Sequence, residues 1–470
     1  MKVWGAIRAT VTVVAGAGLV WGATQVTDTA DATRPADVRR VAADTTSSTL
    51  SDVSLSCTGT DTAGRVQVAS APAAWLTASA SGGSVRLTGK DAQPLNLTRG
   101  RVADGVLPAG AAATVAGKGG LATGLVASQA QVDVRPSARG LAVAPCGGPI
   151  QDGWFFGGGD AAGRVARLTL VNTGATATTV DATVVGADGV DAGATVKGTV
   201  LAPGERKTLV LGDFGSSLAS AAVHVTATGA GVSASLTDSW LDGETPVGED
   251  TTSSAVIPAT KLEIPGVSAT SAAPEVRVAV PGKDEAIVRV RAISPSGDVA
   301  FDKVSTVRSG SSGLVRLTGL ATGSYDVQIT GDVPVAASAM SRTANSGVTD
   351  LAWSPAVEGG KGPAGIALPT GVPNRVTTLM LAAQQRTKVE LVIVTPLGAE
   401  TKTIEVPADR PVVTDPKGAT AVWVRPAGGG AVQAAVTISG RRDDGALLAT
   451  IPLQQTPLSQ STNRLVAARG

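Results

Sequence analysis

Hydrophobic and polar residues alternate along much of the chain, and one alternating unit occurs three times. Its first copy is the apolar segment Arg167–Gly174, followed by a second alternating segment, Thr179–Gly189, that ends in an Asp-Gly turn. Comparable pairs of segments occupy residues 275–297 and 378–398. Alternation with a period of two predicts β-strands with one buried face. The copies lie about 100 residues apart, which is the size of a complete small domain and longer than a solenoid unit.

Each copy contains further segments that are typical of strands. A short strand opens each copy, at residues 153–157, 259–265 and 365–369, and two strands around a small-residue turn close it. The total of about seven strands in about 100 residues is typical of an immunoglobulin-like sandwich, here without its Cys–Trp–Cys core. The predicted fold class is therefore all-β, with tandem β-sandwich domains. A β-propeller is the alternative, because one period could encode two four-stranded blades.

The pattern also predicts how the chain is divided. The segment from residue 51 to residue 148 has strand-like runs but lacks the repeat signature, so we expect a diverged or separate sandwich there. The predicted parts are a signal peptide or membrane anchor at 1–27, a linker at 28–50, an N-terminal β domain at 51–148, and sandwich repeats at 149–250, 251–355 and 356–470.

The first part has the pattern of an export signal. Lys2 and Arg8 precede an apolar stretch from Ala9 to Val20, and no charged residue follows until Asp28. A basic region before a short apolar core is typical of a signal peptide. The uncharged stretch is also just long enough to cross a bilayer as a retained anchor, so both alternatives stay open. In either case, the positive charge on the N-terminal side predicts that the rest of the chain lies outside the cytoplasm.

Composition and charge narrow the class of function. Lys and Arg total 39 and Asp and Glu total 38, so we expect no basic surface for nucleic acid or anionic lipid. Aromatic residues make up 3% of the chain, while 58 glycines and 26 prolines favour short strands and turns over long helices.

The order of the segments resembles that of a known family. A Trp-Phe strand with glycines at 153–157, a Leu-x-Leu-x-Asn-x-Gly segment at 168–174, an alternating strand ending in Asp-Gly, a Pro-Gly turn and a closing pair of strands are similar to a domain-of-unknown-function family of extracellular tandem-repeat proteins. The resemblance covers about residues 150–450 and is strongest at 153–240. It implies β repeats that are exported or membrane-anchored in high-GC Gram-positive bacteria. It implies no catalytic, cofactor-binding or metal-binding residues.

Cys57 and Cys146 are the two cysteines of the chain. In an exported protein such a pair predicts one disulfide, with two buried free thiols as the alternative. Closing a loop of about 90 residues is worth about 4–5 kcal/mol in the chain-entropy treatment. Two thiols and one distant histidine do not supply the four ligands of a structural zinc site, so no metal site is expected.

The sequence offers little catalytic chemistry. His224, the only histidine, lies in an alternating strand with no serine or cysteine motif near it, so we expect a surface position on a strand and no triad. The glycine-rich segment Gly157–Gly163 lacks the Lys-Ser/Thr ending of a phosphate loop and is predicted to be a hairpin turn. No segment indicates the paired carboxylates in a cleft that glycoside hydrolysis requires.

Two sets of residues are candidates for ligand contacts. The acidic segment Asp242–Asp250 is predicted to be a solvated linker, with calcium binding as the alternative. The segments Thr237–Trp240 and Thr349–Trp353 are expected to close successive repeats at matching places, which favours packing at domain junctions for their tryptophans. Stacking of carbohydrate on tryptophan is the other interpretation, and its five candidates are Trp75, Trp154, Trp240, Trp353 and Trp423.

These features predict a non-enzymatic, extracytoplasmic protein of the cell envelope that acts as a scaffold or adaptor and needs no cofactor. Edge strands and loops of rigid β domains suit weak contacts with partners. A cell-wall glycan-binding protein and an accessory subunit of an envelope enzyme are the alternatives. The expected partners are cell-wall glycan or another envelope protein, with no nucleic acid and with membrane contact only through the N-terminal segment.

Overall fold

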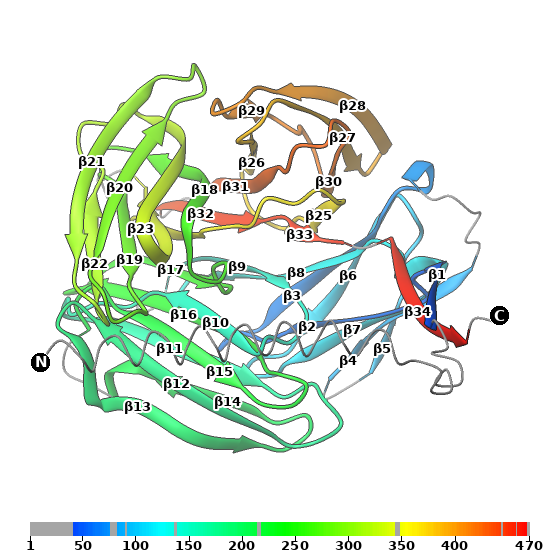
Figure 1. Ribbon diagram of the computed structural model, residues 1–470, viewed down its shortest axis with the longest axis horizontal. Helices are drawn as coiled ribbons and strands as arrows, with labels where there is room; N and C mark the ends of the chain where they lie inside the picture. The colour runs from blue at the N-terminus through cyan, green and yellow to red at the C-terminus, as the bar shows by residue number, and fades with distance from the viewer. Residues whose placement is uncertain are drawn as a thin grey trace, which may run out of the picture. The chain divides into compact units, whose positions relative to one another are not determined.

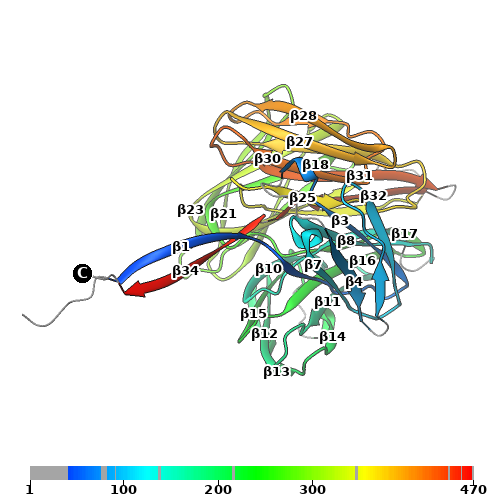
Figure 2. The same cartoon turned by 90° about the vertical axis from the view of Figure 1, so that its right-hand side faces the viewer.

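The computed structural model describes residues 41–75, 82–89, 92–135, 139–213, 218–343, 348–442, 445–456 and 458–467. These residues form antiparallel strands and short 3₁₀ helices, so the predicted all-β class is confirmed. Residues 49–459 form one compact unit. Strands β1 (Val41–Thr49) and β34 (Ser459–Ala467) run side by side in a separate two-stranded sheet (Figure 2). β1 lies within the predicted linker, and the predicted signal or anchor at 1–27 lies outside the described residues.

The compact unit contains four β-sandwiches that share one strand order (Figure 1). Counting strands along the chain within a sandwich, the first, sixth, third and fourth form one sheet, in that order, which we name the outer sheet. The fifth, second, seventh and eighth form the other sheet, which we name the inner sheet. The eighth strand is thus always an edge strand of its sheet, and we name it the inner strand.

The strands have the following bounds. The first sandwich contains β2 (Asp52–Cys57), β3 (Gly64–Ser70), β4 (Gly83–Thr88), β5 (Gln93–Leu95), β6 (Val102–Leu107), β7 (Ala113–Gly119), β8 (Leu125–Asp133) and β9 (Gly140–Cys146), with η1 (Ala73–Trp75) and η2 (Gly120–Ala122). The second contains β10 (Asp152–Phe156), β11 (Arg164–Val171), β12 (Thr178–Gly186), β13 (Gly189–Leu201), β14 (Arg206–Val210), β15 (Ala222–Ala227), β16 (Ser233–Asp242) and β17 (Thr245–Thr252), with η3 (Leu211–Asp213). The third contains β18 (Ala259–Ala269), β19 (Glu275–Ala279), β20 (Ala286–Ile293), β21 (Val299–Val307), β22 (Ser312–Arg316), β23 (Gly323–Arg342) and β24 (Leu351–Pro355). The fourth contains β25 (Ala364–Ala367), β26 (Val376–Ala382), β27 (Thr387–Thr395), β28 (Gly398–Val406), β29 (Val412–Thr414), β30 (Ala421–Pro426), β31 (Gln433–Arg442) and β32 (Gly445–Pro452), with β33 (Gln454–Gln455) added beside β25.

In the third sandwich, β23 supplies both the sixth and the seventh strand. Residues 326–331 pair with β20 in the outer sheet, and residues 336–340 pair with β19 in the inner sheet. The strand therefore passes from one sheet to the other without a break. Each sandwich has eight pairing segments, one more than the sequence predicts.

Alternation of side chains explains why the two sheets of each sandwich face each other. In β12 of the outer sheet, Val180 and Val184 are buried, and they share a core with Leu168 and Leu170 of β11 in the inner sheet. Each of the other sandwiches likewise has a core drawn from both of its sheets. Each repeat is thus one two-layer sandwich, which matches the predicted architecture and not the two side-by-side blades of the propeller alternative.

The four inner strands meet in a closed ring. β9 contacts β17 and β32, and β24 contacts the same two strands. Each inner strand pairs with the seventh strand of its own sheet on one side only, so N–H groups on its other side have no partner strand. Buried N–H groups without acceptors are costly, so the ring requires acceptors from side chains.

Two buried aspartates provide these acceptors. The carboxylate of Asp350 accepts one N–H from each inner strand: Leu141 (2.9 Å), Glu249 (3.3 Å), Leu351 (2.9 Å) and Leu448 (2.8 Å). Burial raises the pKa of Asp350 to about 8, while the four N–H groups act in the opposite direction.

Asp250 has the same role two residues further along the inner strands. Its oxygens accept the N–H groups of Trp353 at 2.7 Å and of Thr251 at 2.8 Å, and Val143 also donates to it. Asp250 is 1% exposed, and burial raises its pKa well above the usual value. Together, the two carboxylates join the edges of the four sandwiches at the ring.

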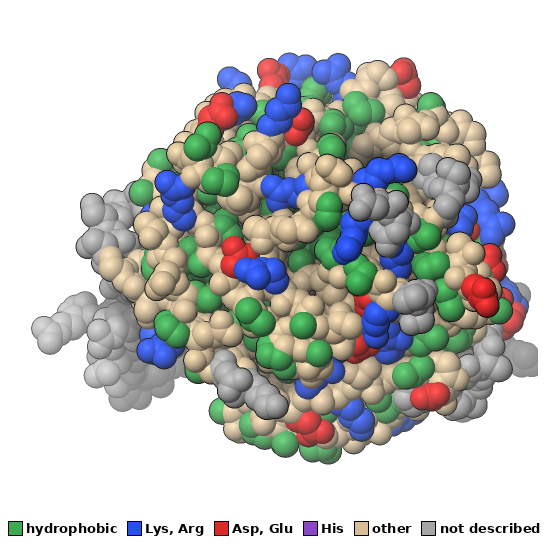
Figure 3. Space-filling view, turned by 180° about the vertical axis from the view of Figure 1, so that it is seen from behind, with side chains coloured by type: hydrophobic (Ala, Val, Ile, Leu, Met, Phe, Trp, Pro, Cys, Tyr) green, Lys and Arg blue, Asp and Glu red, His purple; other side chains and the backbone are tan. Residues whose placement is uncertain are grey.

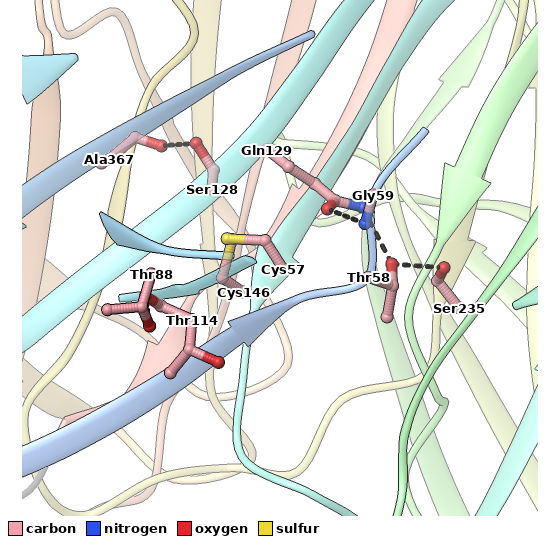
Figure 4. Close-up of a disulfide and its surroundings, with 10 residues drawn as sticks. All are labelled: Cys57, Thr58, Gly59, Thr88, Thr114, Ser128, Gln129, Cys146, Ser235 and Ala367. Atoms are coloured by element: carbon pink, nitrogen blue, oxygen red, sulfur yellow. Dashed lines mark hydrogen bonds between the residues drawn. A yellow bond between two sulfur atoms is a disulfide. The ribbon is translucent and has the colours of Figure 1, made fainter. Parts of the chain in front are cut away.

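A disulfide joins Cys57 and Cys146, as the sequence predicts. It links β2 of the outer sheet to β9 of the inner sheet, so it fastens the two layers of the first sandwich together. Figure 4 shows that contacts to other sandwiches surround it. Thr58 of the first sandwich shares a hydrogen bond of 2.7 Å with Ser235 of the second. Ser128 of the first sandwich donates to the carbonyl of Ala367 of the fourth, also at 2.7 Å.

Candidate functional site

The five candidate tryptophans lie at junctions between sandwiches. Trp75, Trp154, Trp353 and Trp423 are each at most 3% exposed, and Trp240 is half-buried. Stacking on a sugar needs an open ring face, so the four buried rings are packing residues. The ring of Trp240 has the guanidinium groups of Arg164 and Arg342 over it, at 5.0 and 5.5 Å from its centroid.

Two of these tryptophans also make specific polar contacts across a junction. The indole N–H of Trp75 donates to Glu390 of the fourth sandwich at 2.6 Å, and Arg425 lies 4.8 Å above the ring. The indole N–H of Trp353 donates to Asp238 of the second sandwich at 2.8 Å. Such contacts combine burial of a large ring with a satisfied donor, which suits a rigid junction.

His224 lies in β15 and stacks on Trp154, with ring centroids 4.5 Å apart. Its Nε2 is 3.2 Å from Asp152, and its side chain is 30% exposed. The residue is therefore a partly exposed strand residue that covers a buried indole.

The segment Gly157–Gly163 is not a hairpin. It connects β10 of the outer sheet to β11 of the inner sheet, and these two strands do not pair, so the predicted hairpin turn is wrong. The carbonyls of Gly157 and Gly158 accept hydrogen bonds from Arg277 of the third sandwich, at 3.2 and 2.6 Å. Arg277 is 3% exposed, and burial lowers its pKa to about 10. The glycine carbonyls thus provide the anchor for a buried cation at the junction of the second and third sandwiches.

The acidic segment Asp242–Asp250 is not a solvated linker. Most of it is the inner strand β17, in which Glu249 and Asp250 are 3% and 1% exposed. Glu249 contacts Gln131 of the first sandwich at 3.1 Å and Arg167 at 3.5 Å. Burial is the main cause that raises its pKa to about 7, against the lowering effect of Arg167. The carboxylates therefore belong to the ring and to the junction beside it.

The two Thr-Asp segments do not occupy matching places. Thr237–Trp240 lies in β16, a seventh strand, whereas Thr349–Trp353 leads into the inner strand β24, an eighth strand. The sequence similarity reflects two buried aspartates, Asp238 and Asp350, with different tasks. Asp238 binds Arg164 through both oxygens, at 3.0 and 2.5 Å, and this pairing holds the pKa of Asp238 below its usual value despite complete burial.

A cleft with polar lining residues lies between the third and fourth sandwiches, and we name it the Glu263 cleft. A cavity of about 500 Å³ and a second of about 310 Å³ share Lys261, Leu262, Glu263 and Gln384 as lining residues. Glu263 lies in β18 on the outer face of the outer sheet, because its neighbours Leu262 and Ile264 point into the core. Loops of the fourth sandwich, which carry Gln384 and Asp409, line the other side.

A second buried carboxyl group lies against Glu263. Asp326 of β23 is completely buried, and it interacts directly with Glu263, which is 3% exposed. Burial raises the pKa of both groups, and the negative charge of Glu263 raises that of Asp326 further. Two carboxyl groups in contact cannot both ionise easily, so the pair holds one proton between its oxygens. This carboxyl pair was not expected from the sequence, but its two groups contact each other and do not flank a cleft as the paired carboxylates of glycoside hydrolysis do.

Glu263 and Asp326 lie in predicted strands, but the sequence does not predict that they form a pair. The alternation Leu262-Glu263-Ile264 indicates that Glu263 points away from the core, and outward polar residues are expected to be solvated. The sequence shows only that Asp326 and Gln328 are alternate polar residues on another strand of the repeat that contains Glu263. What buries the pair is a set of loops more than 50 residues away, and no local pattern predicts that contact.

On the face seen in Figure 3, basic and acidic side chains occur in small groups among neutral and apolar ones, in keeping with the net charge of +1. Within the described ranges, no group of three or more His, Cys, Asp or Glu residues is arranged to hold a metal ion. The helical segments of the described chain include none that could span a bilayer.

Comparison with known proteins defines the class. Residues 102–417 match a family of unknown function (DUF5719), and because the match covers more than half of the chain, the protein belongs to this family. The matched region begins in β6 of the first sandwich and ends between β29 and β30 of the fourth. It thus includes parts of all four sandwiches. A search of curated proteins finds no match to the chain.

Proposed function

We propose that this protein is a non-enzymatic scaffold or adaptor of the cell envelope. The observation that carries the proposal is the ring, in which Asp350 accepts one N–H from each of the four inner strands. Such a junction fixes the sandwiches to one another, so surfaces on different sandwiches keep a constant separation. Constant separation between binding surfaces is what a scaffold requires.

The edge strands of the outer sheets are suited to contacts with partners. β13, β21 and β28 are edge strands of the outer sheets, and each carries one exposed lysine: Lys197, Lys303 and Lys402. A lysine on an edge strand discourages pairing with other copies of the same edge, while the neighbouring loops stay accessible. The partners we propose are another envelope protein or cell-wall glycan.

Several features support a location outside the cytoplasm. The disulfide between Cys57 and Cys146 is consistent with an oxidising compartment. The basic and then apolar pattern of residues 1–27 supports export by a signal peptide or attachment by a membrane anchor. We further propose that the family comprises exported or membrane-anchored proteins with tandem β repeats from high-GC Gram-positive bacteria.

A non-enzymatic role is also supported by the geometry of the carboxyl pair. Glycoside hydrolysis uses two separate carboxyl groups on opposite sides of a bound sugar. Glu263 and Asp326 instead contact each other, and only Glu263 lines the cleft.

The proposal is tested by crosslinking with mass spectrometry in intact cells, using an amine-reactive reagent. We expect Lys197, Lys303 and Lys402 to give crosslinks to a small set of envelope proteins. As the matched control, a chain with these three lysines changed to arginine should keep its fold and lose the crosslinks. Crosslinks exclusively to cytoplasmic proteins, or an equal yield from the arginine variant, would contradict the proposal.

A further inference from the structure

The Glu263 cleft contains buried acceptor atoms for which the described residues provide no donor of standard geometry. Apart from the proton that the pair shares, Glu263 Oε2 and both carboxylate oxygens of Asp326 have no hydrogen bond of standard geometry among the described residues, although the side chains of Gln384 and Gln328 interact with Glu263 and Asp326 respectively. In the larger cavity of the same cleft, the side-chain oxygen of Gln433 also lacks a donor, and Gln433 is 7% exposed. Buried polar atoms without partners are rare in folded proteins, so several in one cleft indicate an absent donor.

The groups next to the carboxyl pair are acidic, although the lining of the two cavities also includes Lys261, Lys361 and Arg291. The charged groups that act on the pair are acidic, namely the pair itself and Asp409. Arg291 lines the smaller cavity, but its guanidinium donates to Gln328 at 2.7 Å. The remaining charged residues of the cleft are on its exposed rim: Lys261, Lys361 and Glu358.

We propose that the Glu263 cleft binds a small organic ligand through a primary ammonium group. The ammonium ion enters beside Glu263 and takes the place of the proton that Glu263 shares with Asp326. That proton passes to solvent, so both carboxylates become ionised against the ammonium charge and the total charge is conserved. The N–H donors of the ammonium group reach Glu263, whose Oε2 has no donor, whereas Asp326 lines neither cavity and is affected through the proton that it shares with Glu263.

The cleft favours an organic cation over a bare metal ion. A cavity of about 500 Å³ is large enough for an organic body, and the exposed Ile257 at its rim offers an apolar contact. The carbonyl oxygen of Gln433 is available to a second donor of the ligand. Calcium, in contrast, prefers six to eight oxygen ligands, and the described residues around the pair do not form a metal-binding group.

Titration calorimetry on the full chain tests this inference with 1,5-diaminopentane as the probe and 1,5-pentanediol as its neutral match. Two buffers that are not primary amines and differ in ionisation enthalpy report proton release. We expect the diamine to bind with release of up to one proton per chain, and the diol to give no binding. Calcium chloride is the third probe, and no binding is expected.

Variants locate the binding. Glu263→Gln should weaken diamine binding at least tenfold and remove the proton release, and Asp326→Asn should do the same. Glu400→Gln, on the exposed face of β28, is the matched control and should keep both values. The inference is overturned if the diamine does not bind to the folded chain, if it binds without proton release, if the diol or calcium binds equally well, or if Glu263→Gln leaves binding unchanged.

Discussion

At the residue scale, Asp350 joins all four inner strands through one side chain. Four backbone N–H groups from four strands point at its two oxygens. A carboxylate is an acceptor at every position, whereas an amide presents donors on one side. The identity of this residue is therefore determined by the backbone around it and not by solvent or a ligand.

We predict that at pH 9, where Asp350 is mainly ionised, Asp350→Asn lowers the free energy of unfolding by about 2–4 kcal/mol, because the new amide group faces N–H donors in a buried site. Urea unfolding followed by circular dichroism measures the change. Asp302→Asn is the control, because that carboxylate lies on the exposed edge strand β21, and its effect should be much smaller than that of Asp350→Asn. Equal stability of the wild-type and Asp350→Asn chains would refute this role for Asp350.

Glu249 makes the stability of the protein depend on pH. Its pKa is about 7 in the folded chain and near 4.5 when unfolded, so the folded state binds more protons between these values. Stability therefore falls as pH rises from about 4.5 to about 7, by up to about 3 kcal/mol. Glu249→Gln removes this contribution. Unfolding curves at pH 5 and pH 8 should show the smaller pH difference in the variant, and an unchanged difference would exclude Glu249 as the cause.

At the element scale, the inner strands approach one another closely because two of them have glycine where a side chain would collide. A Cβ atom on Gly140 of β9 would lie 2.5 Å from both the N and the O of Glu249, and 2.6 Å from Asp350 Oδ1. A Cβ atom on Gly248 of β17 would lie 2.3 Å from the N of Leu351. The backbone atoms that such a Cβ would meet belong to neighbouring inner strands, so they cannot move aside unless the ring itself changes.

Gly140→Ala is accordingly expected to destabilise the fold by about 2–4 kcal/mol, since the ring must widen to admit one methyl group. Gly148→Ala is the matched control, because a Cβ atom there would meet nothing within 4 Å. Thermal unfolding of both variants checks the prediction. A melting temperature of Gly140→Ala as high as that of the control would contradict the steric argument.

The sequence predicts the strands well, because alternation is a local property. The repeat from Arg167 and the closing pair within β23 are found where the pattern predicts them. The order of strands in the first sandwich was not predicted, since residues 51–148 lack the repeat's turn motifs. The segment Gly157–Gly163 was misassigned because a local pattern does not tell a hairpin from a crossover between sheets.

The candidate site was much less predictable than the strands. Asp250 and Glu249 occur in an acidic, glycine-containing segment that is typical of an exposed loop, yet contacts with the first and third sandwiches bury it. Glu263 and Asp326 are separated by 63 positions, and the fourth sandwich covers them. In both places, burial depends on contacts between sandwiches, which periodicity within one sandwich does not encode.

At the scale of the whole molecule, sharing of the ring predicts cooperative unfolding. Loss of one sandwich would remove an inner strand and leave the other inner-strand edges exposed. We expect scanning calorimetry of residues 49–459 to give one main transition, with a calorimetric enthalpy close to the van't Hoff enthalpy. Separate transitions for individual sandwiches would contradict this prediction.

The disulfide makes the stability of the four-sandwich unit depend on redox conditions. It closes a loop with a sequence separation of 89 residues, so Cys57→Ala with Cys146→Ala should cost about 4–5 kcal/mol. The loss should appear as a lower midpoint of the main transition, since the first sandwich contributes β9 to the ring. Chemical denaturation of the double variant against the oxidised chain measures it. A lower midpoint confined to a minor early transition would argue against the coupling.

The acceptor geometry of Asp350 also limits how such a chain can grow by duplication. A carboxylate has about four lone-pair positions, and here each is matched to one strand. A three-membered assembly would leave one position vacant and a gap beside it, whereas a fifth member would bring an amide with no oxygen to receive it. The four acceptor positions of this one side chain thus equal the number of inner strands in the ring.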